Sequence, residues 1–376
     1  MTASSATAGP TAPAVATVAL LAPSTTKTPG GIARYTEGLL ASTVLRKRRY
    51  ALTHICTHER GSKLHEVRLA IGAAARVPQC SRKARIAHAL VASDASCVRK
   101  LLLLTEARFC GMKTLAHFHG STLVDWLDSL PSTWRRLLIG AADRCSLVAT
   151  LGNRLADYLR SHGLRSPIHI IPNGVEPAPA REPGVPRAPV ILFVGTLGAR
   201  KGTRDLLQTF AQLSDRHPDA RLVLMGDGEV DQAQGLAVEL GIIGRVRFTG
   251  WASAQDVSQM MEQARVLVLP SYNEGMALSV LEAMMRGLPV ITSPVGEHRT
   301  VIEDGRDGLL VPPGDLPALR NALEWVLLNP ALAEQLAQSA RQKALREFDV
   351  SVNHHRVVDL YDVLSGQSTA NTIHRS

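Results

Sequence analysis

Two carboxylates frame the segment of this chain that is best suited to chemistry. Glu274 and Glu282 are separated by seven residues and lie between short apolar, β-rich runs at Val266–Leu269 and Leu288–Ile291. The residues between these runs carry apolar side chains at helical spacing, so the segment predicts a strand, a loop, a helix and a second strand. Glu274 then lies at the carboxyl end of a strand, where parallel sheets bind ligands. An acid beside the free amides of a helix N-terminus suits a sugar attached to a phosphate.

Two adjacent cations, Arg200 and Lys201, indicate an anionic ligand. They follow an apolar strand predicted at Val190–Val194 and precede a helix that opens at Gly202. Cations are unfavourable there, because the helix dipole is positive at the N-terminus. A bound diphosphate resolves this conflict, since both side chains would neutralise its charge as its bond to a sugar breaks.

Two features of the first half can be either structural or functional. Gly30 and Gly31 precede a helical pattern at residues 32–40 and form either a simple turn or a contact to a diphosphate or acceptor. His119 ends a predicted strand, where it is either structural or a ligand contact. His117, two residues earlier on the same face, is interpreted as a core residue.

The elements that would position these residues occur in a repeating order. Apolar strands alternate with helical patterns in two runs, which is typical of doubly wound parallel sheets. Pro177–Pro189 divides the runs, because five prolines in thirteen residues exclude regular structure. We therefore predict an α/β protein with two Rossmann-like domains facing a central cleft. The expected strands are Val15–Leu21, Tyr50–Cys56, Thr114–Phe118, Leu147–Thr150 and Ile168–Ile171, then Val190–Val194, Leu222–Met225, Val246–Thr249, Val266–Leu269, Pro289–Thr292 and Leu309–Val311.

Length and composition exclude several classes of protein. The chain has 376 residues, too many for one ordinary core, and its 45% hydrophobic and 20% charged residues are typical of a soluble globular protein. No apolar run is long enough to span a bilayer, and the run at Ala12–Pro23 lacks a basic leader, so it is interpreted as a strand and not as a signal peptide. The five cysteines are scattered without a CxxC pair, which argues against a zinc site or a disulfide framework and favours a reducing, cytoplasmic setting.

The positive charge favours anionic partners. The net charge is +9, with basic runs at Arg46–Arg49 and Arg82–Arg85. Nucleic acid is not expected, because aromatic residues are only 4% of the chain and no recognition motif accompanies the runs. A solvated face and contact with an anionic membrane surface are the two interpretations, and the second implies a peripheral position on the inner face of the membrane. Trp126–Arg136 is either an amphipathic interfacial patch or an ordinary core edge.

A series of short motifs runs through the second half of the chain. They are Ile171-Pro172-Asn173-Gly174-Val175, Phe193-Val194-Gly195-Thr196-Leu197, Arg200-Lys201-Gly202, Met225-Gly226-Asp227-Gly228-Glu229, Phe248-Thr249-Gly250, the Glu274 to Glu282 segment and Gly287-Leu288-Pro289-Val290. In this order and spacing, the chain resembles the family 4 retaining glycosyltransferases, which share the GT-B fold, over about half of its length. The first half matches more loosely, through Gly30-Gly31 and His117-Phe118-His119-Gly120.

The resemblance implies a role for each candidate residue. Glu274 would contact the transferred sugar and stabilise positive charge at its anomeric carbon, and Lys201 would lie on the leaving diphosphate. Glu282 would bind the ribose of the donor, although Ser279 and Glu282 also have the spacing of a capping box. The catalytic candidates are Glu274, Lys201 and His119, and the donor contacts are Glu282, Arg200, Gly30, Gly31, Gly195, Thr196, Gly226, Trp251, Gly275, Met276, Ala277 and Leu278.

The chain departs from the family pattern at two places. Met276-Ala277 stands where many relatives have Phe-Gly, which leaves the identity of the sugar open. Thr196 stands where many relatives have arginine, and one hypothesis is that Arg200 compensates. The resemblance assigns residues 14–176 to an acceptor domain, 190–347 to a nucleotide-sugar domain and 348–365 to a helix crossing back, with a linker at 177–189, a disordered tail at 1–13 and a frayed tail at 366–376.

By this resemblance, the expected activity is that of a metal-independent, retaining hexosyltransferase. It would use a UDP- or GDP-sugar donor, need no cofactor, and transfer to a saccharide or lipid-linked acceptor in polysaccharide or glycolipid assembly. The sequence shows no metal-ligand spacing and no Ser-His-Asp or Cys-His set, which fits a reaction guided by the departing phosphate. Two alternatives stay open: a nucleotide-sugar epimerase of the same fold and a non-catalytic nucleotide-sugar-binding protein. Residues 63–108, where acceptor contacts are expected, match no recognised pattern.

Overall fold

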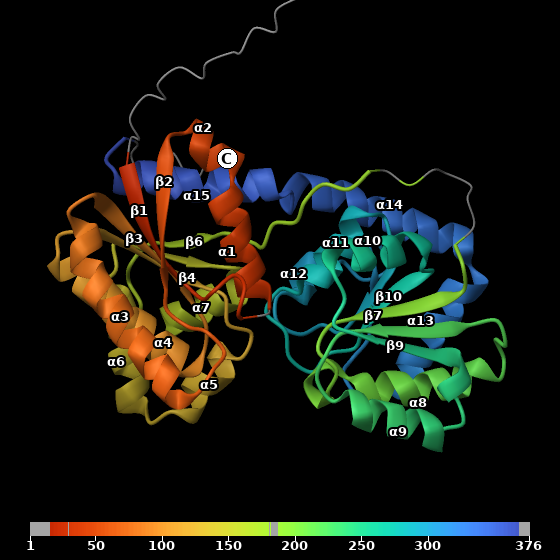
Figure 1. The fold of residues 1–376 in the computed structure, drawn as a ribbon. Helices are drawn as coiled ribbons and strands as arrows, with labels where there is room; N and C mark the ends of the chain where they lie inside the picture. Colours follow the sequence, from red (N-terminus) through yellow and green to blue (C-terminus); the bar gives the residue numbers. More distant parts are fainter. Residues whose placement is uncertain (1–15, 29, 180, 182–186, 368–376) are drawn as a thin grey trace, which may run out of the picture.

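The structure is a computed structural model, and it describes residues 16–28, 30–179, 181 and 187–367 (Figure 1). The predicted tail at residues 1–13 lies outside these ranges, as do part of the predicted linker and all of the predicted C-terminal tail beyond residue 367. The described linker residues contain no helix or strand.

Two parallel sheets of six strands form the two halves of the molecule (Figure 1). Their strand orders are β2-β1-β3-β4-β5-β6 and β12-β11-β10-β7-β8-β9, and every neighbouring pair runs parallel. The predicted α/β class with two doubly wound sheets is therefore confirmed. The strands are β1 (Ala16–Ala22), β2 (Tyr50–Cys56), β3 (Ala84–Val91), β4 (Lys113–Phe118), β5 (Leu147–Thr150) and β6 (Ile168–Ile170), then β7 (Val190–Val194), β8 (Arg221–Met225), β9 (Val246–Gly250), β10 (Val266–Leu269), β11 (Val290–Thr292) and β12 (Leu309–Leu310).

Helices flank both sheets, and hydrophobic clusters fill the space between the layers. The first half contains α1 (Gly31–Ala41), α2 (Thr43–Lys47), α3 (Lys63–Ser81), α4 (Asp94–Phe109), α5 (Leu123–Ser129), α6 (Ser132–Asp143) and α7 (Asn153–Ser161). The second contains η1 (Ala199–Lys201), α8 (Thr203–Ser214), α9 (Val230–Glu239), η2 (Ile243–Arg245), α10 (Ala254–Gln263), α11 (Leu278–Met285), α12 (His298–Val301), α13 (Leu316–Leu328) and α14 (Pro330–Glu347), followed by α15 (Val350–Leu364).

The continuous apolar runs become the strands that the sequence predicts. The runs at Tyr50–Cys56, Leu147–Thr150, Val190–Val194 and Val266–Leu269 coincide with β2, β5, β7 and β10. All four residues of β10 are buried, as expected for a central parallel strand that is covered on both faces.

The sequence-based prediction missed the centre of the first sheet. β3 lies between β1 and β4, and it is flanked in the chain by α3 and α4. Its sequence, Ala84–Val91, contains three alanines, which are poor strand formers, together with Arg85 and His88. β3 is stabilised by pairing on both sides, a non-local effect that no local pattern reports.

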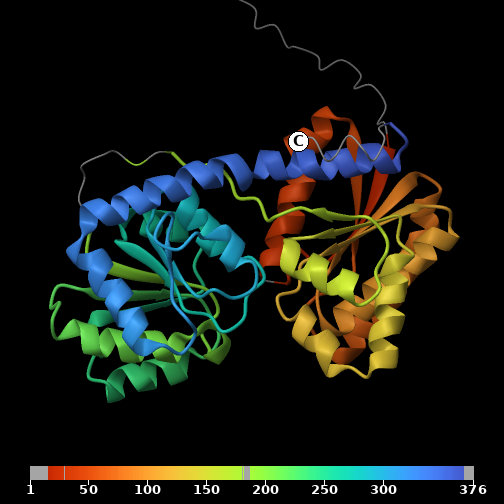
Figure 2. The same ribbon diagram turned by 180° about the vertical axis from the view of Figure 1, so that it is seen from behind.

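The last helix of the chain packs on the first sheet. α14 and α15 follow one another across the back of the molecule (Figure 2), and α15 contributes Tyr361, which is fully buried, to the first half. The Asp362 carboxylate accepts a 2.6 Å hydrogen bond from the Tyr50 hydroxyl and forms an ion pair with Arg48. The basic run at Arg46–Arg49 is therefore not simply a solvated or membrane-facing patch, because part of it holds α15 in place.

Most of the expected interfacial patch at Trp126–Arg136 belongs to the core edge instead. Leu127 is buried, and Trp126 and Leu130 pack against the core of the first half. Trp134 is exposed, and Arg135 donates a 2.9 Å hydrogen bond to Asp128.

Candidate active site

Glycines bring the backbone segments of the second sheet's carboxyl edge close together. Gly202 has a φ of +69°, and a Cβ atom there would lie 2.1 Å from the Pro270 carbonyl oxygen. Only glycine permits this approach, which presses the end of η1 onto the loop after β10. Gly226, after β8, lies so close to Gly195, after β7, that a Cβ atom on Gly226 would be 1.9 Å from the Gly195 oxygen. The edge is thus shaped by backbone contacts that leave no room for side chains.

A buried ion pair between Lys201 and Glu274 lies at this edge. The Lys201 ammonium contacts the Glu274 carboxylate, which also accepts a 2.9 Å hydrogen bond from the Ser271 hydroxyl. Glu274 is only 5% exposed. Burial raises the pKa of the Glu274 carboxyl, but the charge of Lys201 and its hydrogen bond outweigh this effect, so this pKa lies below its ordinary value. The carboxylate is therefore held ionised and can accept hydrogen bonds from hydroxyl groups.

Arg200 supports the loop that carries Glu274. Its guanidinium donates a 3.0 Å hydrogen bond to the Asn273 carbonyl oxygen, and the Tyr272 amide donates one of 2.9 Å to the Arg200 carbonyl oxygen. Arg200 is exposed, so its remaining donors face solvent. The sequence did not predict this hydrogen bond between Arg200 and the loop.

His119 lies opposite Glu274 across the domain interface. A small cavity is lined by His119 and Gly120 of the first half and by Glu274 and Gly275 of the second. The Asn173 side chain hydrogen-bonds the His119 ring, whereas Nε2 of His119 is buried without a partner among the described residues. An unpaired buried ring nitrogen leaves one hydrogen-bonding position for a ligand.

His119 also belongs to a row of three buried histidines. Nε2 of His88 and Nδ1 of His117 are 3.3 Å apart, and the His117 and His119 ring centroids are 4.1 Å apart. Burial lowers the pKa of His117 to about 3 and the pKa values of His88 and His119 well below their ordinary value, so the rings are neutral. His117 is a core residue, as predicted. Within the described ranges, no group of three or more His, Cys, Asp or Glu side chains is arranged to hold a metal ion.

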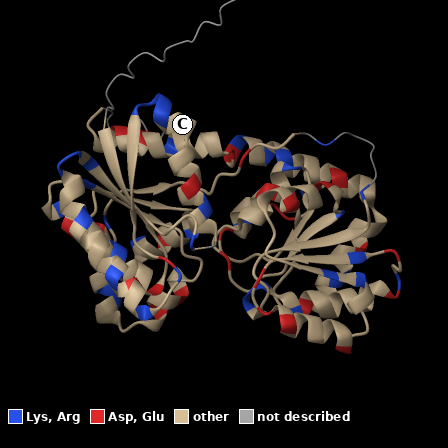
Figure 3. Cartoon of the chain, viewed as in Figure 1, with Lys and Arg blue, Asp and Glu red and all other residues tan. Residues whose placement is uncertain are grey.

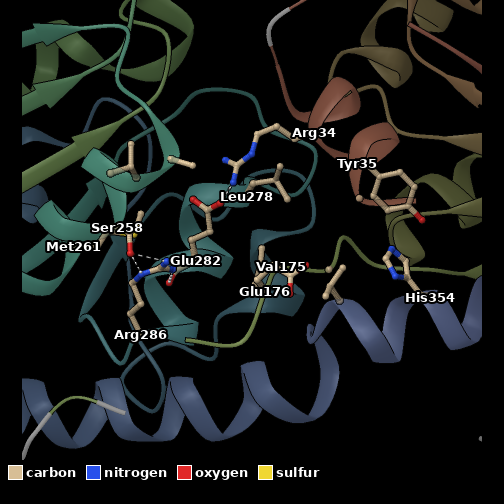
Figure 4. Close-up of a pocket in the computed structure, with 15 residues that line it drawn as sticks. Arg34, Tyr35, Val175, Glu176, Ser258, Met261, Leu278, Glu282, Arg286 and His354 are labelled. Atoms are coloured by element: carbon tan, nitrogen blue, oxygen red, sulfur yellow. Dashed lines mark hydrogen bonds and ion pairs between the residues drawn. The ribbon is translucent and has the colours of Figure 1, made fainter. Parts of the chain in front are cut away.

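Glu282 lines a second cavity, of about 240 Å³, between α1, α10, α11 and α15 (Figure 4). Its carboxylate forms an ion pair with Arg34 of α1, whose side chain is 50% exposed. Sequence reasoning missed Arg34. The available signal was the same as for Lys201, because Arg34 is a cation in the first turn of a helix that follows two glycines.

The predicted capping box at Ser279 and Glu282 is wrong. Helix α11 begins at Leu278, its N-cap is Ala277, and no side chain caps it. Ser279 and Glu282 both lie inside the helix, where they cannot exchange the two capping bonds. The Ala277 amide, which was expected to be open to the donor, instead donates a 3.3 Å hydrogen bond to Nε2 of His298.

Several predicted donor contacts lie together where the two halves meet. A Cβ atom on Gly31 would be 3.7 Å from Cδ1 of Leu278, whereas the same position on Gly30 faces open space. The Asn173 side chain donates a 2.9 Å hydrogen bond to the Met276 carbonyl oxygen. These contacts tie the loop after the first sheet to the segment between Glu274 and Glu282.

The structure does not bring Trp251 and Thr196 to this group. Trp251 is 65% exposed and borders a separate hollow that no other predicted site residue lines. Thr196 is exposed as well, and neither residue lines the two cavities between the halves.

Glu297 is a second interface residue that sequence reasoning missed. Its buried carboxylate accepts hydrogen bonds from the backbone amides of Arg154 and Leu155, at the start of α7 in the first half. A Cβ atom on Gly152 would lie 2.0 Å from its Oε2 atom, which shows how closely the halves approach. No local pattern predicts this contact, because its partners are backbone atoms of the other half.

Two solved structures share this architecture. Sucrose-phosphate synthase from Thermosynechococcus elongatus superposes with a TM-score of 0.77 and 21% identity, covering 94% of this chain and 100% of that one. HepE from Anabaena, solved with UDP-glucose, gives a TM-score of 0.72 and 21% identity, covering 92% and 99%. The fold is therefore that of the GT-B glycosyltransferases, as predicted.

Sequence comparison identifies the family. The model of the glycosyl transferases group 1 matches residues 178–343. The putative glycosyltransferase EpsD of Bacillus subtilis is 30% identical over 293 residues, which cover 71% of this chain and 74% of EpsD. This chain belongs to the glycosyl transferases group 1. It spans about half the length of most other curated relatives that it matches.

Proposed function

We propose that this protein transfers a sugar from a nucleoside diphosphate to an acceptor hydroxyl with retention of anomeric configuration. The observation that carries the proposal is the buried Lys201–Glu274 pair, which lies opposite the unpaired ring nitrogen of His119. Membership of the glycosyl transferases group 1 supports the same activity. HepE was solved with UDP-glucose, which favours a UDP-sugar over a GDP-sugar as the first donor to test. The proposed reaction needs neither a metal ion nor a cofactor.

In the proposed reaction, the acceptor oxygen attacks the anomeric carbon on the face from which the diphosphate leaves. The carbon–oxygen bond to the diphosphate breaks, and the diphosphate takes the electron pair and accepts the acceptor's proton. Lys201 shares its charge between Glu274 and the leaving phosphate, and Glu274 accepts hydrogen bonds from the sugar hydroxyls. Catalysis then consists of positioning and charge stabilisation.

The donor's ribose would bind at Glu282, in the second cavity. Arg34 already contacts this carboxylate, so the ribose must share Glu282 with Arg34 or displace it. Among the acceptors, we propose a saccharide or a lipid-linked saccharide, used in polysaccharide or glycolipid assembly. A lipid-linked acceptor implies a peripheral location on the cytoplasmic face of a membrane.

The test is incubation of the protein with UDP-glucose, UDP-galactose, UDP-N-acetylglucosamine and GDP-mannose, with and without candidate acceptors. We expect release of nucleoside diphosphate that is unaffected by EDTA, and an NMR spectrum of the product with the donor's anomeric configuration. Glu274→Gln should abolish release, whereas Glu262→Gln, an exposed change on α10, should not. An altered sugar without transfer would indicate an epimerase, binding without release would indicate a binding protein, and an inverted product would contradict retention.

A further inference from the structure

Helix α3 presents its largest apolar side chains to solvent. Leu64, Val67 and Ile71 are 60%, 54% and 66% exposed, and their spacing places them along one line of the helix. The buried residues of α3, which face the protein, are Ala73 and Val77. An ordinary surface helix has the opposite arrangement, with its large apolar residues inside.

Helix α4 extends this apolar surface. It packs against α3 on the same side of the first sheet (Figure 1), and its outer side exposes Leu102 and Phe109 by 65% and 85%. Soluble monomers seldom expose several large apolar side chains in one place. We call the surface formed by Leu64, Val67, Ile71, Leu102 and Phe109, with the exposed cations around them, the α3–α4 face.

The segment that contains α3 and α4 also carries most of the protein's net charge. Residues 60–113 contain eleven Lys and Arg but three Asp and Glu, a net charge of +8 against +9 for the whole chain. Figure 3 shows Lys and Arg residues along α3 and α4. The exposed cations on and beside the two helices are Arg60, Lys63, Arg68, Arg76, Arg82, Lys83 and Arg108.

We propose that the α3–α4 face binds the surface of an anionic lipid bilayer. The apolar side chains would enter the boundary between head groups and acyl chains, while the surrounding cations would lie near lipid phosphates. This mode of binding needs no membrane-crossing segment, and in the described ranges no helix is long and apolar enough to be one. A second copy of the chain fits less well, because it would bring two basic faces together.

The position of this face suits a lipid-linked acceptor. Both helices begin at the carboxyl edge of the first sheet, α3 after β2 and α4 after β3, and this is the edge that carries His119 after β4. A saccharide held by a lipid in the bilayer would therefore reach the site past the first turns of α3 and α4. The inference deepens the proposed function, but bilayer binding requires neither donor nor turnover, so the two can fail separately.

The test is co-sedimentation of the whole protein with vesicles of phosphatidylcholine, alone and mixed with phosphatidylglycerol, at low and high salt. We expect binding to the mixed vesicles that weakens with salt, since exposed charges are screened. The triple variant Leu64→Ser, Val67→Ser, Ile71→Ser should lose about tenfold or more in affinity. Arg68→Gln with Arg76→Gln should weaken binding and reduce its salt dependence.

A matched control removes three exposed leucines from the other half. Leu328→Ser, Leu332→Ser, Leu345→Ser should bind vesicles as the wild type does, and both triple variants should release nucleoside diphosphate normally. The proposal would be overturned if the wild-type protein did not bind mixed vesicles at low salt, or if the α3 variant bound them normally. Light scattering that shows a dimer which the α3 variant dissociates, or binding of nucleic acid in place of lipid, would overturn it as well. Vesicle binding without donor turnover would instead leave this inference standing and remove the proposed function.

Discussion

At the scale of single residues, the Lys201–Glu274 ion pair stabilises the fold, and the proposed reaction uses the same two side chains. Both side chains are largely buried, at 13% and 6% exposure, so the attraction between their opposite charges offsets the loss of their hydration. Removing one partner of such a pair leaves an uncompensated buried charge, which costs about 3–5 kcal/mol. A loss of activity in a single variant would therefore not separate catalysis from folding.

A double variant separates the two effects. Lys201→Met should lower the rate of nucleoside diphosphate release by about 10²–10³-fold, as expected when a preorganised charge is removed, and should also lower the Tm. Adding Glu274→Gln should restore the Tm, because no unpaired charge remains, while the activity stays lost. Calorimetry and a release assay on the three variants measure this, and recovery of activity in the double variant would contradict the proposed role of the charge.

The pH dependence of stability at this site should reverse between wild type and variant. In the wild type, the pKa of Glu274 is below its ordinary value, so the pair stabilises the fold above that value and the stabilisation is lost as pH falls. In Lys201→Met, the charge that opposes the effect of burial is removed, so the pKa of Glu274 rises and the contribution of Glu274 to stability should grow as pH falls. Because the buried histidines destabilise both proteins in acid, the quantity to compare is the difference in Tm: the deficit of Lys201→Met relative to the wild type should shrink between neutral and mildly acidic pH.

At the scale of elements, β3 and β4 make the first sheet sensitive to acid. His88, His117 and His119 are neutral when folded because burial lowers their pKa values, and they would titrate normally when unfolded. Below the ordinary histidine pKa, the unfolded chain binds protons that the folded chain does not. The free energy of unfolding should thus decrease as the pH is lowered, by up to about 1.4 kcal/mol per pH unit for each histidine.

Urea unfolding followed at neutral pH and in mild acid measures this loss. His88→Gln should give a shallower dependence on pH than the wild type, whereas His355→Gln, an exposed change on α15, should not. Equal slopes for the wild type and His88→Gln would show that another group controls the acid sensitivity.

Elements whose stability is local could be predicted from sequence, and those stabilised by distant contacts could not. The valine- and leucine-rich β7 and β10 were predicted residue for residue, because such runs fit only buried strands. β3 was missed, since its alanines favour a strand only once β1 and β4 pair with it. In the site, Lys201 was found from the conflict of its charge with the helix dipole, and Glu274 from its place at the end of a strand, whereas the partner Ser271 depends on loop geometry.

At the scale of the whole molecule, the Arg34–Glu282 ion pair links the two halves. Arg34→Gln should shift the protein toward an open arrangement, by about fivefold in population at most, because a half-exposed pair is worth up to about 1 kcal/mol. Small-angle scattering should then show a larger radius of gyration, and saturating donor should reduce it again.

The control for this prediction is Arg286→Gln. Arg286 lines the same cavity but bonds Ser258 and the Glu282 carbonyl oxygen, all within the second half. Its loss should leave the radius unchanged. A radius that responds equally to both variants would show that the cavity, and not the ion pair, controls the arrangement.

The path of α15 determines how this protein can be recombined with a relative. The helix follows the second half in the chain, yet its Tyr361 and Asp362 complete the first. A chimera that joins one protein's first half to another's second half therefore needs two crossovers, one in the linker and one after Glu347, so that α15 stays with the first sheet. During synthesis, the apolar face that α15 covers likewise stays uncovered until residues 350–364 have been made, so the core of the first half cannot be completed before the second half has been synthesised.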